Sequence, residues 1–153
     1  MAWDKELAEL ALRQELAQRM GGADKVQRHR NNGKIPVRER IALLVDEGSL
    51  VEVGGLAGSG QYDDGGQLVD FTPANLVMGR ARIGGRPAVV MGDDFTVRGG
   101  ANDGAVGDKM IVAEQMAHDL RLPLVRLVDG TGGGGSVKNI ELKWHTLLPK
   151  LKS

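Results

Sequence analysis

The chain of 153 residues has no cysteine, few aromatic residues and no excess charge, and each absence excludes a class of function. Without cysteine there is no disulfide, no thiol nucleophile and no thiolate metal site. Lys and Arg together number 20, as do Asp and Glu, so no overall field favours nucleic acid or an anionic membrane as a partner. No apolar run reaches membrane-spanning length, and the acidic segment MAWDKELAEL is unlike a secretory or transit peptide. The expected location is therefore cytoplasmic.

Glycine is what the chain has in excess. It supplies 23 of the 153 residues, about twice its usual share of roughly 7%, whereas aromatic residues supply 3%. Many backbone positions must therefore lie in turns or in places of close approach. At this length a single domain still buries roughly 68–70% of the surface that its unfolded chain exposes.

Residues 1–48 have a helical period and predict three helices that form an N-terminal arm. The helices are expected at residues 3–20, at residues 23–30 and in VRERIALLVDEG after Pro36. A basic run crosses the second and third of them: Lys25, Arg28, His29, Arg30, Lys34, Arg38 and Arg40. A nucleic-acid surface and a solvated helix face are both open interpretations of this run. The second is favoured, because no aromatic residues are interleaved and acidic residues follow.

Residues 49–137 change to short β-rich runs. Strands are predicted at residues 50–53, 76–83 and 87–91, the last two joined by Gly84-Gly85 as a hairpin. Between the first two strands, about twenty residues show no clear periodicity, and a loop of that length is functional, mobile or a sign of a wrong assignment. Within it, the cluster Tyr62, Asp63 and Asp64 is interpreted as a solvated turn rather than as a metal or acid–base site.

A further helix is predicted over residues 102–120, with Asn102 or Asp103 as its N-cap. Its apolar residues cover so much of its circumference that it is expected to be buried on a broad front. They are Val106, Met110, Ile111, Val112, Ala113, Met116, Ala117 and Leu120. After Pro123, the strand LVRLV is apolar enough for an interior position in a parallel sheet.

Two glycine-rich turns, VRGG and DGTGGGGS, follow predicted strands on either side of this helix. The carboxyl ends of strands are where ligands bind in open β/α architectures, and glycine leaves backbone N–H groups accessible to an oxyanion or phosphate. Gly130, Gly132 and Gly135 fit the dinucleotide pattern G-x-G-x-x-G, but the acidic strand end that this site needs about twenty residues later is absent, and no Walker sequence follows. Two interpretations stay open: a backbone site for an oxyanion or acyl thioester, and a flexible turn without a ligand.

Three segments in order carry a resemblance to a known family: RHRNNGKIPVRERIALLVDEGSLVEV, GRARIGGRPAVVMGDDFTVRGG and LRLPLVRLVDGTGGGGS. Together they resemble the N-terminal part of the N-domain of the carboxyltransferase (beta) subunit of biotin-dependent acyl-CoA carboxylases, the family of the propionyl-CoA, methylcrotonyl-CoA and acetyl-CoA carboxylases. The resemblance covers most of residues 26–136. It implies an α/β fold of crotonase-like (ClpP/crotonase) ββα repeats, incomplete here, and transfer of a carboxyl group from carboxybiotin to the α-carbon of an acyl-CoA.

The resemblance also implies the site residues. In this family, paired backbone amides stabilise the negative charge that develops on the thioester and biotin oxygens, and one such donor is worth about 3 kcal/mol. The implied residues are Gly99 and Gly100 as catalytic, and Val97, Arg98, Ala101, Gly132 and Gly133 as substrate-binding. No metal site is expected, and none of the three histidines, His29, His118 and His145, is assigned as a general base.

The implied partners are an acyl-CoA as the CoA thioester substrate, biotin as carboxybiotin on a biotin carboxyl carrier, and a biotin carboxylase subunit. A homo-oligomer, or a complex with the missing carboxyltransferase half, is also implied, whereas nucleic acid and membrane are not. Family members are several times longer, and residues 138–153 do not match them, so a truncated, engineered or split chain that is inactive alone is expected. Two hypotheses stay open: a component of the enzyme, and a non-catalytic assembly or CoA-binding subunit that keeps the scaffold.

Overall fold

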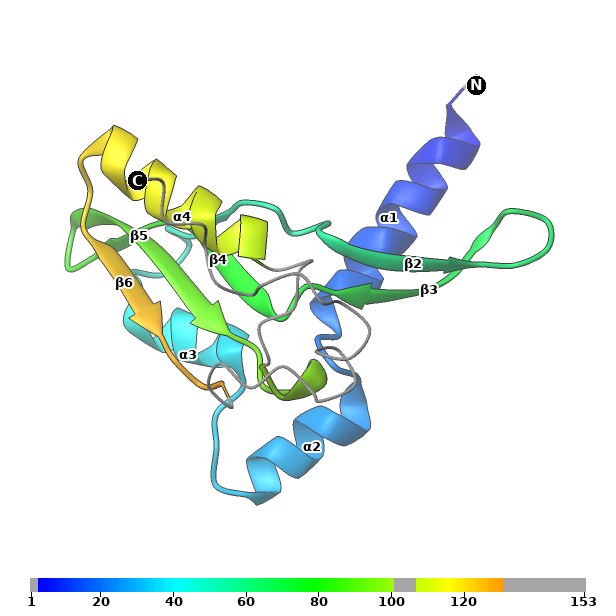
Figure 1. The fold of residues 1–153 in the computed structure, drawn as a ribbon, viewed down its shortest axis with the longest axis horizontal. Coiled ribbons are helices and arrows are strands. Elements are labelled where there is room, and N and C mark those ends of the chain that lie inside the picture. The colour runs from blue at the N-terminus through cyan, green and yellow to red at the C-terminus, as the bar shows by residue number, and fades with distance from the viewer. Residues whose placement is uncertain (1–2, 101–106, 131–153) are drawn as a thin grey trace, which may run out of the picture.

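The computed structural model describes residues 3–100 and 107–130 (Figure 1). Its helices are α1 (Asp4–Gln18), α2 (Ala23–Asn31), α3 (Val37–Leu44), a short 3₁₀ helix η1 (Arg98–Gly100) and α4 (Gly107–Leu120). Its strands are β1 (Val51–Glu52), β2 (Gly58–Tyr62), β3 (Leu68–Pro73), β4 (Leu76–Ile83), β5 (Arg86–Asp93) and β6 (Leu124–Leu127). The four predicted helices and the four predicted strands are confirmed, although the expected caps Asn102 and Asp103 lie outside the described residues. None of the described helices is long and apolar enough to cross a membrane.

The main sheet has the strand order β1-β4-β5-β6. β4 and β5 form the predicted antiparallel hairpin, and the φ angles of 56° at Gly84 and 78° at Gly85 are those of a two-residue turn whose backbone is left-handed. β6 lies parallel to β5, with Val89 paired to Leu124. The sheet is therefore mixed, and its parallel pair is the one that carries the two glycine turns.

Helices cover both faces of this sheet, α4 on one side and α3 on the other (Figure 1). Successive residues of a strand point to opposite faces, so β4 and β5 contribute to two separate apolar clusters. The cluster under α4 consists of Ala74, Leu76, Met78, Val89, Met91, Ala113 and Ala117. The cluster under α3 consists of Val37, Ile41, Val77, Ala81, Ala88 and Val90.

The third helix of the expected N-terminal arm is thus a layer of the core, which corrects the prediction for α3. Val37 and Ile41 are 2% and 1% exposed, because the apolar stripe of α3 lies flat on the sheet. α1 instead packs through Leu16 and Ala17 against β3. The domain boundaries after residues 48 and 137 stay predictions.

The stretch predicted as a loop without periodicity contains a hairpin, which is a second correction. β2 and β3 pair antiparallel, with Gly60 opposite Phe71. Glycine is depleted in strands, so a glycine-rich strand such as GSGQY gives no recognisable strand signal. In the turn, the Asp63 carboxylate accepts hydrogen bonds from the N–H groups of Gly65 and Gln67, each at 2.9 Å. These hydrogen bonds agree with the solvated-turn interpretation of Asp63.

The broad burial predicted for α4 is wrong within the described part of the chain. Ala113 is fully buried, but Ile111 and Val112 are 62% and 48% exposed, because only one face of the helix meets the sheet. The interior position predicted for the strand after Pro123 is not found either. β6 pairs with β5 alone among the described strands, and Val128 just beyond it is 68% exposed.

We expect the 153-residue chain to self-associate in solution. The outer edge of β6 offers unpaired backbone groups among the described strands, and the outer face of α4 exposes Ile111 and Val112 beside it. Sedimentation velocity at micromolar concentration is expected to show dimers or larger species. Ile111→Glu is expected to shift the distribution toward monomer.

The matched control is Leu43→Glu, at an exposed apolar residue of α3 on the other side of the sheet, which is expected to leave the distribution unchanged. A single sharp monomer boundary for the unsubstituted chain, together with cooperative melting, would contradict the prediction.

Candidate functional site

The first predicted glycine turn and the described start of the second, Asp129 and Gly130, meet at one edge of the sheet. Because β5 and β6 are parallel, their carboxyl ends lie side by side. A Cβ built on Gly100 would lie 2.8 Å from the carbonyl oxygen of Asp129 and 3.1 Å from the Cα of Gly130. The backbone of the first turn is therefore in contact with Asp129 and Gly130, and a side chain at residue 100 would push the two segments apart.

The turn after β5 has left-handed backbone at three successive residues. The φ angles are 52° at Arg98, 66° at Gly99 and 65° at Gly100. Glycine adopts this conformation freely, whereas at Arg98 it costs about 1–2 kcal/mol. The Gly100 N–H donates to the carbonyl of Val97 at 3.1 Å. An oxyanion bound by this N–H would have to replace that carbonyl as its acceptor.

Asp94 and Thr96 hold the turn in place. The buried Asp94 carboxylate accepts hydrogen bonds from the N–H of Thr96 at 2.9 Å and from its hydroxyl at 2.6 Å. The same hydroxyl oxygen accepts the Gly21 N–H at 2.9 Å, which fixes the turn to the link between α1 and α2. Burial raises the pKa of the Asp94 carboxyl above its ordinary value, and the bonds from Thr96 act in the opposite direction.

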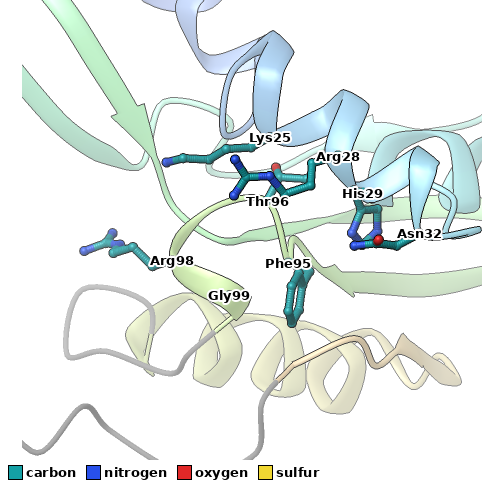
Figure 2. Close-up of a pocket in the computed structure, with 8 residues that line it drawn as sticks. All are labelled: Lys25, Arg28, His29, Asn32, Phe95, Thr96, Arg98 and Gly99. Atoms are coloured by element: carbon teal, nitrogen blue, oxygen red, sulfur yellow. The ribbon is translucent and has the colours of Figure 1, made fainter.

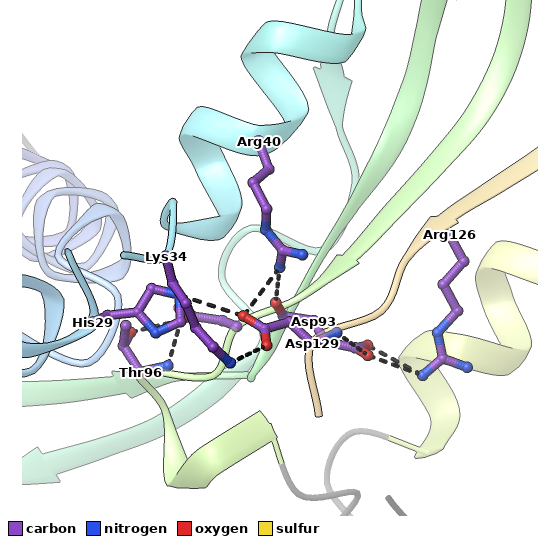
Figure 3. Close-up of polar contacts among 8 residues, drawn as sticks. His29, Lys34, Arg40, Asp93, Thr96, Arg126 and Asp129 are labelled. Carbon is purple, nitrogen blue, oxygen red and sulfur yellow. Dashed lines mark hydrogen bonds and ion pairs between the residues drawn. The ribbon is translucent and has the colours of Figure 1, made fainter. Parts of the chain in front are cut away.

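The segment directly after β6 is held by a cluster of basic side chains around Asp129 (Figure 3). The Asp129 carboxylate lies 2.8 Å from Lys34 Nζ, 3.3 Å from His29 Nε2 and 3.8 Å from the Arg40 guanidinium. Its own backbone N–H donates to the Asp93 carboxylate at 3.3 Å. Three basic residues from α2, α3 and the link between them thus converge on the end of β6.

Asp93 ties the ends of β5 and β6 together. Its carboxylate accepts hydrogen bonds from Arg126 at 3.1 and 3.4 Å, and its carbonyl accepts one from Arg40 at 2.8 Å. The sequence does not predict Asp93 or Asp129 as site residues. A signal is nevertheless present, because Asp93 closes β5, Asp129 follows β6 directly before Gly130, and a basic run lies upstream.

A pocket of about 240 Å³ opens beside η1 (Figure 2). Its lining consists of Lys25, Arg28, His29, Asn32, Phe95, Thr96, Arg98 and Gly99. The ring of Phe95 stacks on His29 with the centroids 5.7 Å apart, and Lys34 Nζ lies 4.6 Å from the centroid of Phe95. This aromatic pair forms part of the wall, and the glycine turn forms another part.

The structure brings together some of the predicted site residues. Arg98 and Gly99 line the pocket, Gly100 contacts the second turn, and Val97 is 2% exposed and anchors the first turn from within. Ala101, Gly132 and Gly133 lie outside the described residues. The roles implied for all of these positions stay predictions.

Comparison with known proteins identifies the family. The family described as the carboxyl transferase domain matches residues 28–142. The chain is 37% identical over 113 residues to the probable mitochondrial methylcrotonoyl-CoA carboxylase beta chain of Drosophila melanogaster. It is 36% identical over 115 residues to the mitochondrial propionyl-CoA carboxylase beta chain of Homo sapiens. Each alignment covers 73% of this chain, but only 19% and 21% of the respective relative.

Solved structures agree with this assignment. The transcarboxylase 12S hexamer, solved with methylmalonyl-coenzyme A and methylmalonic acid bound, matches with a TM-score of 0.72 and 27% identity over 84% of this chain and 25% of that one. The beta subunit of geranyl-CoA carboxylase from P. aeruginosa matches with a TM-score of 0.69 and 26% identity over 90% of this chain and 25% of that one.

The described α/β arrangement is therefore a partial crotonase-like fold of the carboxyltransferase type. The chain belongs to the carboxyl transferase domain family. It spans about a fifth to a quarter of the length of the relatives it matches.

Gly100→Ala is expected to destabilise the chain more than a matched change at Gly48. Both glycines are left-handed, with φ of 65° and 69°, so an alanine at either position carries a similar backbone cost of about 1–2 kcal/mol. At Gly48 the added methyl group meets nothing within 4 Å, whereas at Gly100 it meets the Asp129 carbonyl at 2.8 Å. We expect this contact to add about 1–3 kcal/mol to the loss. Urea denaturation of both variants at one protein concentration measures the difference, and equal losses would contradict the prediction.

Asp94→Asn is expected to make the chain more stable at neutral pH than the aspartate does. The asparagine oxygen can still accept the hydrogen bonds from Thr96, and the buried charge is gone. The pKa of Asp94 in the folded state is raised above the ordinary 3.8. As the pH falls, the Asp94 carboxylate therefore takes up a proton at a higher pH in the folded chain than in the unfolded chain. The advantage of the variant is therefore largest above the raised pKa and shrinks as the pH falls from there toward 3.8. Denaturation at a series of pH values measures it, and an advantage that grows on acidification would refute the prediction.

Proposed function

We propose that this chain is a carboxyltransferase component of a biotin-dependent acyl-CoA carboxylase. The observation that carries the proposal is the contact of the first glycine turn with Asp129 and Gly130 at the carboxyl ends of parallel strands, in a fold that belongs to the carboxyl transferase family. That edge is where open α/β sheets bind their ligands. The named relatives are carboxylases of CoA thioesters, which supports an acyl-CoA as the substrate.

The chemistry suits a site built from backbone rather than from acids. Loss of the α-proton of an acyl thioester leaves an enolate whose negative charge rests on the thioester oxygen. Fixed N–H donors stabilise such a charge best when they need no rearrangement at the moment of reaction. We assign this role to the amides of Gly99 and Gly100, which the Asp94 and Asp129 anchors hold in place. Carboxybiotin, when presented by a carrier, would supply the carboxyl group: the bond between its ureido nitrogen and the carboxyl carbon breaks as that carbon bonds to the α-carbon, and the freed biotin nitrogen takes up the proton that the α-carbon loses.

Assembly with other subunits is part of the proposal. The relative solved as transcarboxylase 12S is described as a hexamer within a multienzyme core. We infer an oligomer here as well, served by a biotin carboxyl carrier and a biotin carboxylase. The exposed apolar faces of α4 and β6 offer surface for such contacts. Both curated relatives described above are named as mitochondrial, and the cytoplasmic location stays a prediction from the sequence.

One observation favours a second candidate, a non-catalytic assembly or CoA-binding subunit. The Gly100 N–H already donates to the Val97 carbonyl, so in this conformation it is not presented to a ligand. A scaffold that binds an acyl-CoA without turnover needs no such donor. The two candidates differ in whether this N–H changes its acceptor when an acyl thioester binds.

The purified 153-residue chain is expected to show no carboxyl transfer by itself. It spans at most 25% of the relatives' length in these comparisons, so it lacks any oxyanion donor that the rest of such a chain supplies, and the loss of one such donor costs about 10²–10³ in rate. Loss of the surface that positions the second reactant removes several kcal/mol more. The measurement is a carboxylation assay with a carboxybiotin donor and propionyl-CoA or acetyl-CoA, in which turnover by the chain alone would refute the expectation.

Addition of the remaining carboxyltransferase segments in trans is expected to restore turnover if the chain is an enzyme component. Gly100→Val should then abolish it. Gly48→Val, which carries the same β-branched side chain at a similar φ but in open space, should leave turnover largely intact. A complemented complex that binds acyl-CoA but never turns over would favour the non-catalytic candidate.

A further inference from the structure

The structure accounts for most of the basic run that crosses α2 and α3. Its seven members are Lys25, Arg28, His29, Arg30, Lys34, Arg38 and Arg40. Four of them are ion-paired with carboxylates: Lys34 and Arg40 with Asp129, Arg30 with Glu39, and Arg38 with Glu52. A fifth, His29, has its Nε2 3.3 Å from the Asp129 carboxylate. Contacts within the chain account for these five side chains without a ligand.

Lys25 and Arg28 are the two that remain. Neither has an ion-pair or hydrogen-bond partner for its side chain within residues 3–100 and 107–130. They stand three residues apart on α2, so they share one face of that helix. Figure 2 shows that face directed toward the loop that carries Thr96 and Gly99.

The pocket between this helix face and the loop is rich in positive charge. Lys25, Arg28 and Arg98 all line it, and no acidic residue does. The Asp129 carboxylate behind the wall is already shared by three basic side chains. Cations gathered in one pocket repel each other, and an anion that binds between them relieves the repulsion.

We infer that this pocket is an oxyanion-binding site and that its ligand is an oxyanion of the acyl-CoA thioester. Arginine and lysine together suit phosphate and carboxylate groups, which accept several charge-assisted hydrogen bonds. A CoA thioester carries phosphates at one end, and a carboxylated acyl group carries a carboxylate beside the thioester at the other. The identity of the ligand rests on the proposed function, whereas the presence of an anion site does not.

The test compares two double variants that remove the same charge. Lys25→Gln with Arg28→Gln alters the pocket, and Lys5→Gln with Arg86→Gln removes two exposed charges outside it. Calorimetry measures the binding of four probes: inorganic pyrophosphate, CoA, methylmalonyl-pantetheine and propionyl-pantetheine. The third carries a carboxylate without phosphates, and the fourth carries neither group.

Compared with the unsubstituted chain, the pocket variant is expected to bind pyrophosphate about tenfold more weakly or worse, and to show the same loss for either CoA or methylmalonyl-pantetheine. Propionyl-pantetheine should bind both double variants equally. A loss confined to CoA assigns the pocket to the phosphates, and a loss confined to methylmalonyl-pantetheine assigns it to the carboxylate. In one outcome, the pocket variant loses pyrophosphate binding, but CoA, methylmalonyl-pantetheine and propionyl-pantetheine all fail to bind the unsubstituted chain. The anion site then stands and the proposed function fails.

Salt provides a second measurement that needs no variant to fold. The Debye length falls from about 10 Å at 0.1 M to about 3 Å at 1 M ionic strength, so added salt should weaken the binding of the charged probes to the unsubstituted chain and spare propionyl-pantetheine. The inference is overturned if no oxyanion probe binds the unsubstituted chain, or if both double variants bind every probe equally.

Discussion

Two carboxylates at the ends of two parallel strands hold the rest of the site together. Asp93 closes β5 and Asp129 follows β6, and each is largely removed from solvent. A carboxylate in that position must be paired, because its desolvation is not otherwise offset. Arg126 pairs with Asp93, and three basic side chains from the N-terminal region pair with Asp129. The strand ends, and therefore the glycine turns that follow them, are positioned by these contacts.

This requirement explains why the N-terminal helices lie where they do. α3 buries its apolar stripe on the sheet, and from that position Arg40 reaches both the carbonyl of Asp93 and the carboxylate of Asp129. α2 contributes His29, whose ring stacks on Phe95 of the first turn while its Nε2 faces Asp129. Residues that resemble a detached arm in the sequence are thus part of the framework of the site.

Local sequence signals predicted those features that depend on local physics. The Gly84-Gly85 turn and the helical stripes depend on backbone conformation and period, and both were confirmed. The β2–β3 hairpin was not predictable in this way, because its strands include glycines and its buried side chains, Leu68 and Phe71, find their partner in α1 far upstream. Likewise, the helical spacing of apolar residues in α4 does not determine which part of its apolar surface meets the sheet.

The glycine turns themselves were predicted, but their geometry was not. Glycine at position 100 is consistent with ligand access, which is why the sequence favours a backbone site. The structure adds a reason that operates without any ligand, because a side chain there would collide with the Asp129 carbonyl. A glycine at this position is therefore required equally by an enzyme and by an inert scaffold of the same fold.

Catalysis is distinguished from scaffolding by the acceptor of one hydrogen bond. In the present arrangement the Gly100 N–H donates to Val97, and three successive left-handed residues close the turn around that bond. One of the three is Arg98, whose left-handed backbone costs about 1–2 kcal/mol that a glycine would not incur. Strain of this size persists only where the surroundings impose it, and here the Asp94 and Asp129 anchors do so from both sides. An oxyanion would serve as the ligand of this N–H by replacing the Val97 carbonyl as its acceptor. The backbone site is thus compatible with catalysis even though its donor is internally bonded in this conformation.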